Sequence, residues 1–155
     1  MTFGDEDHRR DLTTRGSADA YAAGEWLDDH GFAPTHALVS SATRTRATWA
    51  ALAEGSGSAA EATVDDALYI ADPDSVLDVL RAVPEDAEVV AYVGHNPTAA
   101  SLAHLLDDGG PDPQAFRRMS AGFPTMAMAV LEVPVAWADL DPGTAHLAAF
   151  HVGHG

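Results

Sequence analysis

Two turns between expected strands and helices carry residues that could bind an anion. In the first, Leu38-Val39-Ser40-Ser41-Ala42-Thr43-Arg44, a serine can cap a helix and Arg44 then falls in the first helical turn. A cation at that end opposes the helix dipole, which favours negative charge there. A bound anion would resolve this conflict, with Arg44 acting as a bidentate clamp. Alternatively, Arg44 is a surface arginine paired with a local carboxylate, and the turn alone favours that simpler interpretation.

The second turn is Tyr92-Val93-Gly94-His95-Asn96-Pro97-Thr98. Gly94 lets another group approach the backbone closely, Asn96 is a suitable N-cap, and Pro97 is a suitable first helical residue. His95 would then lie where a strand ends and a helix begins, where it can donate to phosphate oxygens, and bound phosphate would keep it protonated. The alternative is a capped, hydrogen-bonded structural histidine. Together the two turns put an arginine and a histidine at one sheet edge, which favours a site.

Helices and strands must alternate to position these turns. Apolar spacing predicts a helix from Thr14 that ends at His30-Gly31 and a second helix that begins at Ser41. The remaining expected elements are strands at 37–39, 61–69 (weak and irregular), 88–93 (buried on both faces), 126–133 and 145–152, and helices at 73–83 and 97–106. This order predicts a three-layer α/β/α sandwich with a mostly parallel sheet, which binds ligands at the carboxyl ends of its strands.

Composition narrows the class of protein. The chain has 155 residues, enough for one domain spanning 1–155, and carries a net charge of -16. Such a charge disfavours nucleic acid and anionic membranes as partners. With no cysteine, the sequence excludes disulfides and thiolate chemistry. It has no apolar run of membrane-spanning length, and its first residues are polar and acidic, so we expect a cytoplasmic protein.

The ordered set of motifs resembles the histidine-phosphatase superfamily, also called phosphoglycerate-mutase-like. The Gly-His-Asn turn at 94–96 is similar to the family's second histidine motif. Residues 40–48 are similar to its serine-x-x-x-arginine turn, with Thr48 at the usual threonine. Residues 7–16, Asp-His-Arg-Arg-Asp-Leu-Thr-Thr-Arg-Gly, are similar to a further family stretch.

Two shorter matches, Leu68-Tyr69 and Phe123-Pro124-Thr125, point to the SixA-like branch of small phosphohistidine phosphatases. The resemblance covers nearly the whole chain, in order. It implies a phosphatase that acts on a phosphohistidine protein or a phosphorylated small molecule, with no cofactor and no metal. A mutase is disfavoured, because the chain lacks a large insertion between Thr48 and Tyr69.

The resemblance also implies roles for individual residues. In the family, one histidine attacks phosphorus and forms a covalent phosphohistidine, while two arginines and a second histidine hold the phosphoryl oxygens. Arg44 corresponds to one arginine and His95 to the second histidine, with Asn96 beside it in the phosphate site. Asp66 is a candidate general acid, although a solvated acidic loop is the favoured explanation. A good leaving group such as phosphohistidine would need little acid catalysis.

The nucleophile expected from the resemblance is absent. It should lie in an arginine-histidine-glycine or arginine-histidine-alanine motif at the end of a first strand, before residues 7–16, and the chain has no such motif. His8 is followed by Arg9 but stands at a different family position. Met1 would then be an internal methionine of a longer protein, so that the domain lacks its first strand at the N-terminus. Alternatively, the chain is an inactive phosphate- or phosphoprotein-binding module, or another residue replaces the nucleophile. We expect negligible phosphatase activity from these 155 residues.

Overall fold

The computed structural model describes residues 12–69, 71–95, 98–108, 114, 117–119, 122 and 127–152. The chain divides into two compact units. The first comprises residues 1–70, 87–95 and 153–155, and the second comprises residues 71–86 and 96–152. Both turns predicted to bind an anion begin in the first unit, which holds Arg44 and His95.

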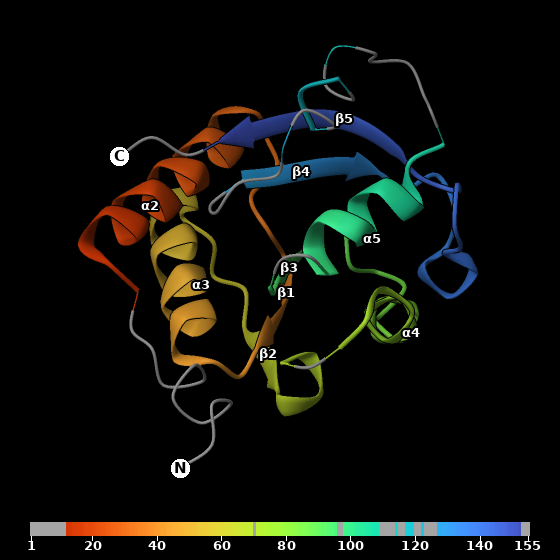
Figure 1. The fold of residues 1–155 in the computed structure, drawn as a ribbon, viewed down its shortest axis with the longest axis horizontal. Helices are drawn as coiled ribbons and strands as arrows, with labels where there is room; N and C mark the ends of the chain where they lie inside the picture. Colours follow the sequence, from red (N-terminus) through yellow and green to blue (C-terminus); the bar gives the residue numbers. More distant parts are fainter. Residues whose placement is uncertain are drawn as a thin grey trace. The chain divides into compact units, whose positions relative to one another are not determined.

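Two helices, α2 (Thr14–Asp29) and α3 (Thr43–Ser56), lie side by side in the first unit (Figure 1). They approach so closely that a Cβ at Gly24 would collide with the backbone of α3, and one at Gly55 with the backbone of α2. The predicted end of the first helix is confirmed, since Gly31 follows it with φ +77°. Trp49 and Leu52 of α3 are buried, as the apolar spacing predicts.

The parallel sheet of the first unit has the order β2-β1-β3. Its strands are β1 (His36–Ser40), β2 (Ala62–Asp65) and β3 (Val90–Val93), and both pairings are parallel. A short 3-10 turn, η1 (Asp66–Leu68), follows β2. Apolar residues of β1 such as Val39 are fully buried. The parallel arrangement predicted from the alternating pattern is therefore confirmed.

The expected burial of the strand at 88–93 is wrong. All four residues of β3 are half-buried, whereas four of the five residues of β1 are buried. The reason lies in the order of the strands. Among the described strands β3 pairs with β1 alone, so it is an edge strand, while β1 has a neighbour on each side.

The second unit contains two helices and an antiparallel pair of strands. Helix α4 (Pro73–Arg81) begins with proline as predicted, after an Asp72 N-cap whose side chain accepts a hydrogen bond from the Ser75 backbone. Helix α5 spans Thr98–Leu106. Strands β4 (Ala127–Glu132) and β5 (His146–Val152) pair antiparallel, and the 3-10 turn η2 (Trp137–Asp139) lies between them in the sequence.

The α/β class with a parallel sheet is thus confirmed. No helix within the described residues is both long and apolar enough to cross a membrane. That the chain is one domain and lacks a first strand stays a prediction.

Candidate functional site

The register of the parallel sheet brings three strand ends to one level. Ser40, the last residue of β1, pairs with Asp65, the last residue of β2. On the other side, Val39 pairs with Val93, the last residue of β3. The segments that leave these strands therefore start from the same edge of the sheet, which is where parallel α/β sheets bind ligands.

The turn from β1 into α3 is closed by Thr45 rather than capped by a serine. The buried Thr45 hydroxyl lies 2.7 Å from the Ser40 carbonyl oxygen and 2.9 Å from that of Ala42. The N-cap residue is Ala42, which has no side chain able to cap the helix. The predicted serine cap is therefore wrong: Thr45 secures the turn from inside the first helical turn, and the N-cap residue Ala42 makes no side-chain hydrogen bond to the first N–H groups of α3.

Arg44 lies in this uncapped first turn and is half-buried. The first turn of α3 contains no acidic residue. Within the described part of the chain, no carboxylate forms an ion pair with the Arg44 guanidinium, although the chain as a whole carries a charge of -16. The interpretation of Arg44 as a surface arginine balancing a local carboxylate finds no support here. Its cation and the positive end of the helix dipole remain together, as an anion site requires.

His95 follows β3 and reaches across to β1. Its Nε2 lies 2.7 Å from the Ser40 hydroxyl oxygen, a contact between residues 55 positions apart in the sequence. The Tyr69 ring, just after η1, packs edge-on against the imidazole, with ring centroids 5.2 Å apart and planes at 84°. Segments leaving all three strands therefore meet at His95.

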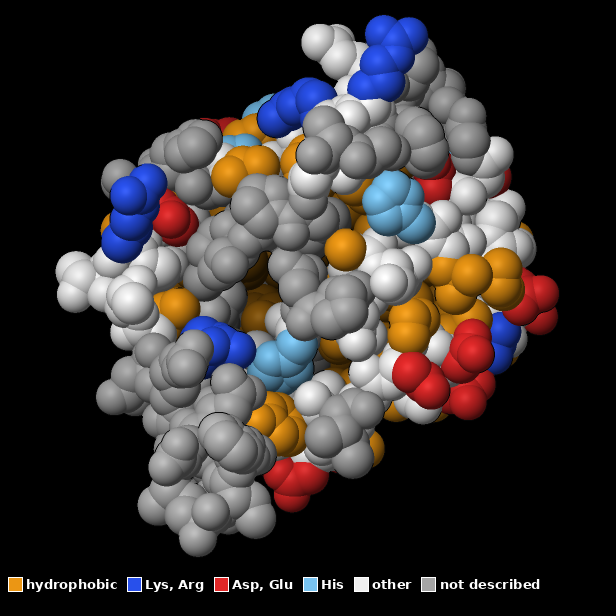
Figure 2. All heavy atoms as spheres, viewed as in Figure 1, with side chains coloured by type: hydrophobic (Ala, Val, Ile, Leu, Met, Phe, Trp, Pro, Cys, Tyr) orange, Lys and Arg blue, Asp and Glu red, His pale blue; other side chains and the backbone are white. Residues whose placement is uncertain are grey.

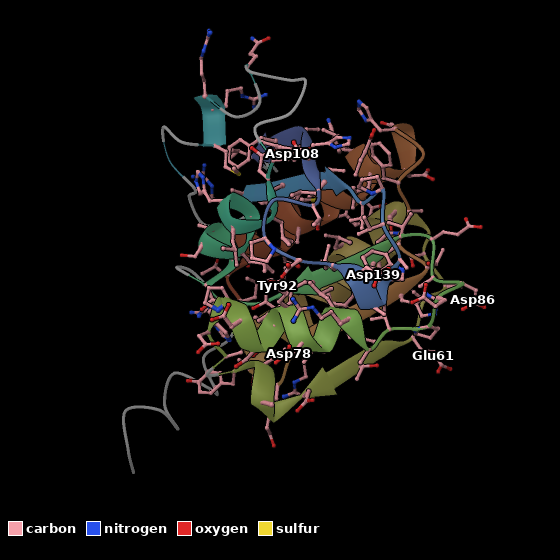
Figure 3. All side chains as sticks on the ribbon, turned by 90° about the vertical axis from the view of Figure 1, so that its right-hand side faces the viewer. Glu61, Asp78, Asp86, Tyr92, Asp108 and Asp139 are labelled. Carbon is pink, nitrogen blue, oxygen red and sulfur yellow. The ribbon has the colours of Figure 1, made fainter. Side chains whose placement is uncertain are left out.

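Tyr92 places a second aromatic ring on β3 (Figure 3). Its hydroxyl is buried and has no hydrogen-bond partner among the described residues, and burial raises the pKa of the phenol to about 12. Any Cβ added at Gly94 would collide with this ring. The close approach to the Gly94 backbone predicted from the sequence is therefore confirmed, and the group that approaches is the Tyr92 side chain.

Asp66 and Asn96 are the two remaining residues of the site predicted from the sequence. Asp66 is exposed in η1, after Asp65, whose carboxylate accepts a hydrogen bond from the Ala67 backbone N–H. Its role as a general acid stays a prediction. Asn96 lies outside the described residues, as do His8 and the Phe123-Pro124-Thr125 segment. Within the described part of the chain, no group of three or more histidine or carboxylate side chains could hold a metal ion.

Ser40 and Tyr69 contact His95, but the sequence analysis assigned neither of them a role. Both residues lie in segments that resemble family motifs, so the sequence marks their positions but does not show that they contact His95. The contact itself depends on the sheet register, which pairs Val39, the residue before Ser40, with the last residue of β3.

Comparison with known proteins assigns the family. The structure of a candidate phosphohistidine phosphatase SixA from Nakamurella multipartitia superposes with a TM-score of 0.82 and 35% sequence identity, covering 95% of this chain and 87% of that chain. The chain belongs to the SixA-like histidine phosphatase family. A candidate SixA from Agrobacterium tumefaciens is similar at a TM-score of 0.76 and 26% identity, covering 98% of this chain and 89% of that one.

Sequence relatives of this SixA-like chain include an uncharacterised protein of Mycobacterium tuberculosis. It is 40% identical over 147 residues, which are 94% of this chain and 90% of that protein. No family model matches the chain. The fold predicted from the resemblance is thereby confirmed, and so is the SixA-like branch.

Proposed function

We propose that the site around Arg44 and His95 binds a phosphoryl group, and that the protein is a phosphatase that hydrolyses a phosphohistidine or a small phosphoester through a phosphohistidine intermediate. The observation that carries the proposal is Arg44: a half-buried guanidinium, with no carboxylate partner among the described residues, in the uncapped first turn of α3. Backbone N–H groups, the helix dipole and a bidentate cation together select a dianionic, tetrahedral ligand. Asn96 is proposed as a further phosphate ligand.

The chemistry of phosphoryl transfer suits such a site. Most of the rate comes from positioning and from neutralising charge on the equatorial oxygens. Arg44 and His95 supply those two functions from two neighbouring strand ends. The substrate is proposed to be a phosphohistidine protein or a phosphorylated small molecule. Nucleic acid is disfavoured by the charge of -16.

Turnover also requires a nucleophile, which the family carries in an arginine-histidine motif. No arginine-histidine-glycine or arginine-histidine-alanine motif occurs in the 155 residues. We therefore propose that these residues by themselves bind phosphate without turning over a phosphoester. The second candidate function is a phosphate- or phosphoprotein-binding module on the same fold, which this missing motif favours.

Binding is tested by thermal unfolding of the 155-residue chain in increasing inorganic phosphate. A ligand that binds the folded state alone raises the unfolding temperature with concentration. Arg44→Ala and His95→Ala should remove this rise. Arg46→Ala is the matched control, because Arg46 is exposed two residues along the same helix and should leave the rise intact. If phosphate has no effect on the unmodified chain, both candidate functions fail.

Turnover is measured in parallel on an aryl phosphate, using the 155-residue chain and a version extended upstream to the preceding in-frame start. Activity in the longer protein alone, abolished by Arg44→Ala or His95→Ala, supports the phosphatase. Phosphate binding without activity in either protein supports the binding module. Robust turnover by the 155-residue chain, lost in His8→Ala, would contradict the proposed absence of a nucleophile.

A further inference from the structure

The Ser40 hydroxyl is sealed from solvent and must find its hydrogen-bond acceptor inside the protein. Ser40 has an exposed fraction of 0%, and its side chain has one contact of hydrogen-bond length within the described residues, to His95 Nε2 at 2.7 Å. A hydroxyl carries one hydrogen that it can donate, and its oxygen can in addition accept hydrogen bonds. Leaving that hydrogen without an acceptor in a buried place carries the full desolvation cost.

The number of available acceptors decides which group donates in the hydrogen bond between Ser40 and His95. If Nε2 carried a hydrogen and donated it to Ser40, the hydroxyl hydrogen would need a second acceptor, and the described residues offer none. If the hydroxyl donates to Nε2 instead, both groups are satisfied. We infer that Ser40 is a positioning residue that donates to Nε2 of His95 and thereby holds the neutral imidazole in the tautomer protonated at Nδ1.

Tyr69 also restrains the orientation of the His95 imidazole ring. Its edge-on contact at 5.2 Å and 84° opposes rotation of the imidazole about its own axis. Ser40 belongs to β1 and Tyr69 follows η1, so the two restraints come from different segments. The two contacts together restrain the ring to one orientation, one from the end of strand β1 and the other from the residue that follows η1.

The functional consequence rests on the proposed phosphate site. A donor already held in one orientation and one tautomer meets a phosphoryl oxygen without a prior rotation, which removes part of the entropic cost of binding. Ser40 does not need to touch the ligand to have this effect. Its loss should weaken phosphate binding through His95, by about fivefold to tenfold, the value of one ordinary hydrogen bond.

The tautomer can be measured directly on the unmodified 155-residue chain. At about pH 8.5, above the usual titration range of histidine, ¹⁵N chemical shifts distinguish a protonated ring nitrogen from a bare one. The His95 signals are assigned by their disappearance in His95→Asn. We expect Nδ1 protonated and Nε2 bare. Finding Nε2 protonated, or an unrestrained mixture of both forms, would overturn the inference without any variant of Ser40.

Variants then test the source of the preference. Ser40→Ala should abolish the fixed tautomer and weaken phosphate binding by the stated factor, while Ser40→Thr, which keeps the hydroxyl, should restore both. Ser56→Ala is the matched control, since Ser56 is also a buried serine of the first unit, with its hydroxyl on the Ala53 carbonyl. A fixed tautomer that persists in folded Ser40→Ala would contradict the assignment to Ser40.

The inference and the proposed function can fail independently. A fixed tautomer without any response to phosphate would leave the positioning of His95 intact and reject the phosphate site. Phosphate binding that depends on Arg44 and His95, with Nε2 of His95 protonated, would retain the site and reject the role of Ser40.

Discussion

Two helical arginines of this chain have opposite surroundings. Arg81, at the end of α4, donates from Nε to the Leu140 carbonyl oxygen at 2.6 Å, and its two terminal nitrogens reach Asp78 at 2.9 Å and Asp141 at 3.0 Å. Arg44, at the start of α3, has no carboxylate partner within the described residues. Each guanidinium nitrogen of Arg81 has a protein acceptor, whereas the Arg44 guanidinium is the proposed ligand-binding group.

The position of each arginine along its helix reinforces the difference. Arg81 lies in the last turn of α4, where a cation is favoured by the helix dipole, whereas Arg44 lies in a first turn, where it is not. Carboxylates also gather on the surface over α4 and the η2 turn (Figure 2), and Asp78 on α4 and Asp139 on η2 both face the viewer in Figure 3. Arg81 thus stabilises an acidic region.

Two histidines repeat this contrast. His146 of β5 lies between carboxylates, with Nε2 at 3.0 Å from Glu132 and Nδ1 at 3.6 Å from Asp108. His95 instead contacts the uncharged Ser40 hydroxyl. In a chain with 24 acidic residues and 8 basic ones, a carboxylate beside a cation is the ordinary outcome. Within the described residues, Arg44 departs from this outcome, which supports the proposed anion site at its end of the sheet.

Giving Arg44 a carboxylate neighbour should therefore abolish the difference between its surroundings and those of Arg81. Ala47 lies one turn along α3 from Arg44, at the spacing where helical side chains meet. Ala47→Glu should weaken phosphate binding by about tenfold, because the new carboxylate occupies the guanidinium and repels the ligand. The control Ala47→Gln has the same size without the charge. Equal effects of the two variants in a phosphate titration would show that bulk, not pairing, limits the site.

Removing the paired arginine, Arg81, should lower stability without affecting phosphate binding. Arg81→Ala should lower the free energy of unfolding by about 1–2 kcal/mol, mainly because the buried Leu140 carbonyl loses its donor, since exposed ion pairs contribute little. Urea denaturation measures this, with Arg81→Lys expected to recover only part of the loss. Phosphate affinity should not change in either variant. A weaker phosphate response in Arg81→Ala would show that the two arginines are not separate in function.

Sequence reasoning located both turns because local signals define them. Pro73, Gly31 and the apolar run of β1 mark element boundaries without reference to the rest of the chain. These signals place Arg44 and His95 at strand ends, and the topology of a parallel sheet brings those ends together. The family resemblance supplied the roles.

Three features were not read from the local pattern, and two of them depend on contacts between distant segments. The serine cap was wrong because Thr45 satisfies the turn from inside the helix. The half-burial of β3 follows from its place at the edge of the described sheet. The Ser40 to His95 bond needs the register of β1 against β3, which no local signal specifies.

Tyr92 provides the smallest and most discriminating test. Like Arg44 it has a polar group without a partner, but burial raises the pKa of its phenol to about 12 from the ordinary 10.0, so the hydroxyl stays neutral. The raised pKa means that its contribution to stability is complete below about pH 10 and is lost as the pH rises toward 12. Tyr92→Phe should remove this part of the alkaline loss, measured by urea denaturation between about pH 8 and pH 11.

The control is Tyr21→Phe, because Tyr21 is 40% exposed and should leave the alkaline loss unchanged. At neutral pH, Tyr92→Phe should be neutral or slightly stabilising, since it deletes a buried hydroxyl that has no partner. Phosphate affinity should also stay the same. If Tyr92→Phe weakened phosphate binding, the phenol would be a second ligand-directed group, and the contrast between the two regions would rest on more than Arg44. If it does not, the Arg44 guanidinium, which has no carboxylate partner among the described residues, is the feature that distinguishes the proposed binding edge from the buried Tyr92 hydroxyl.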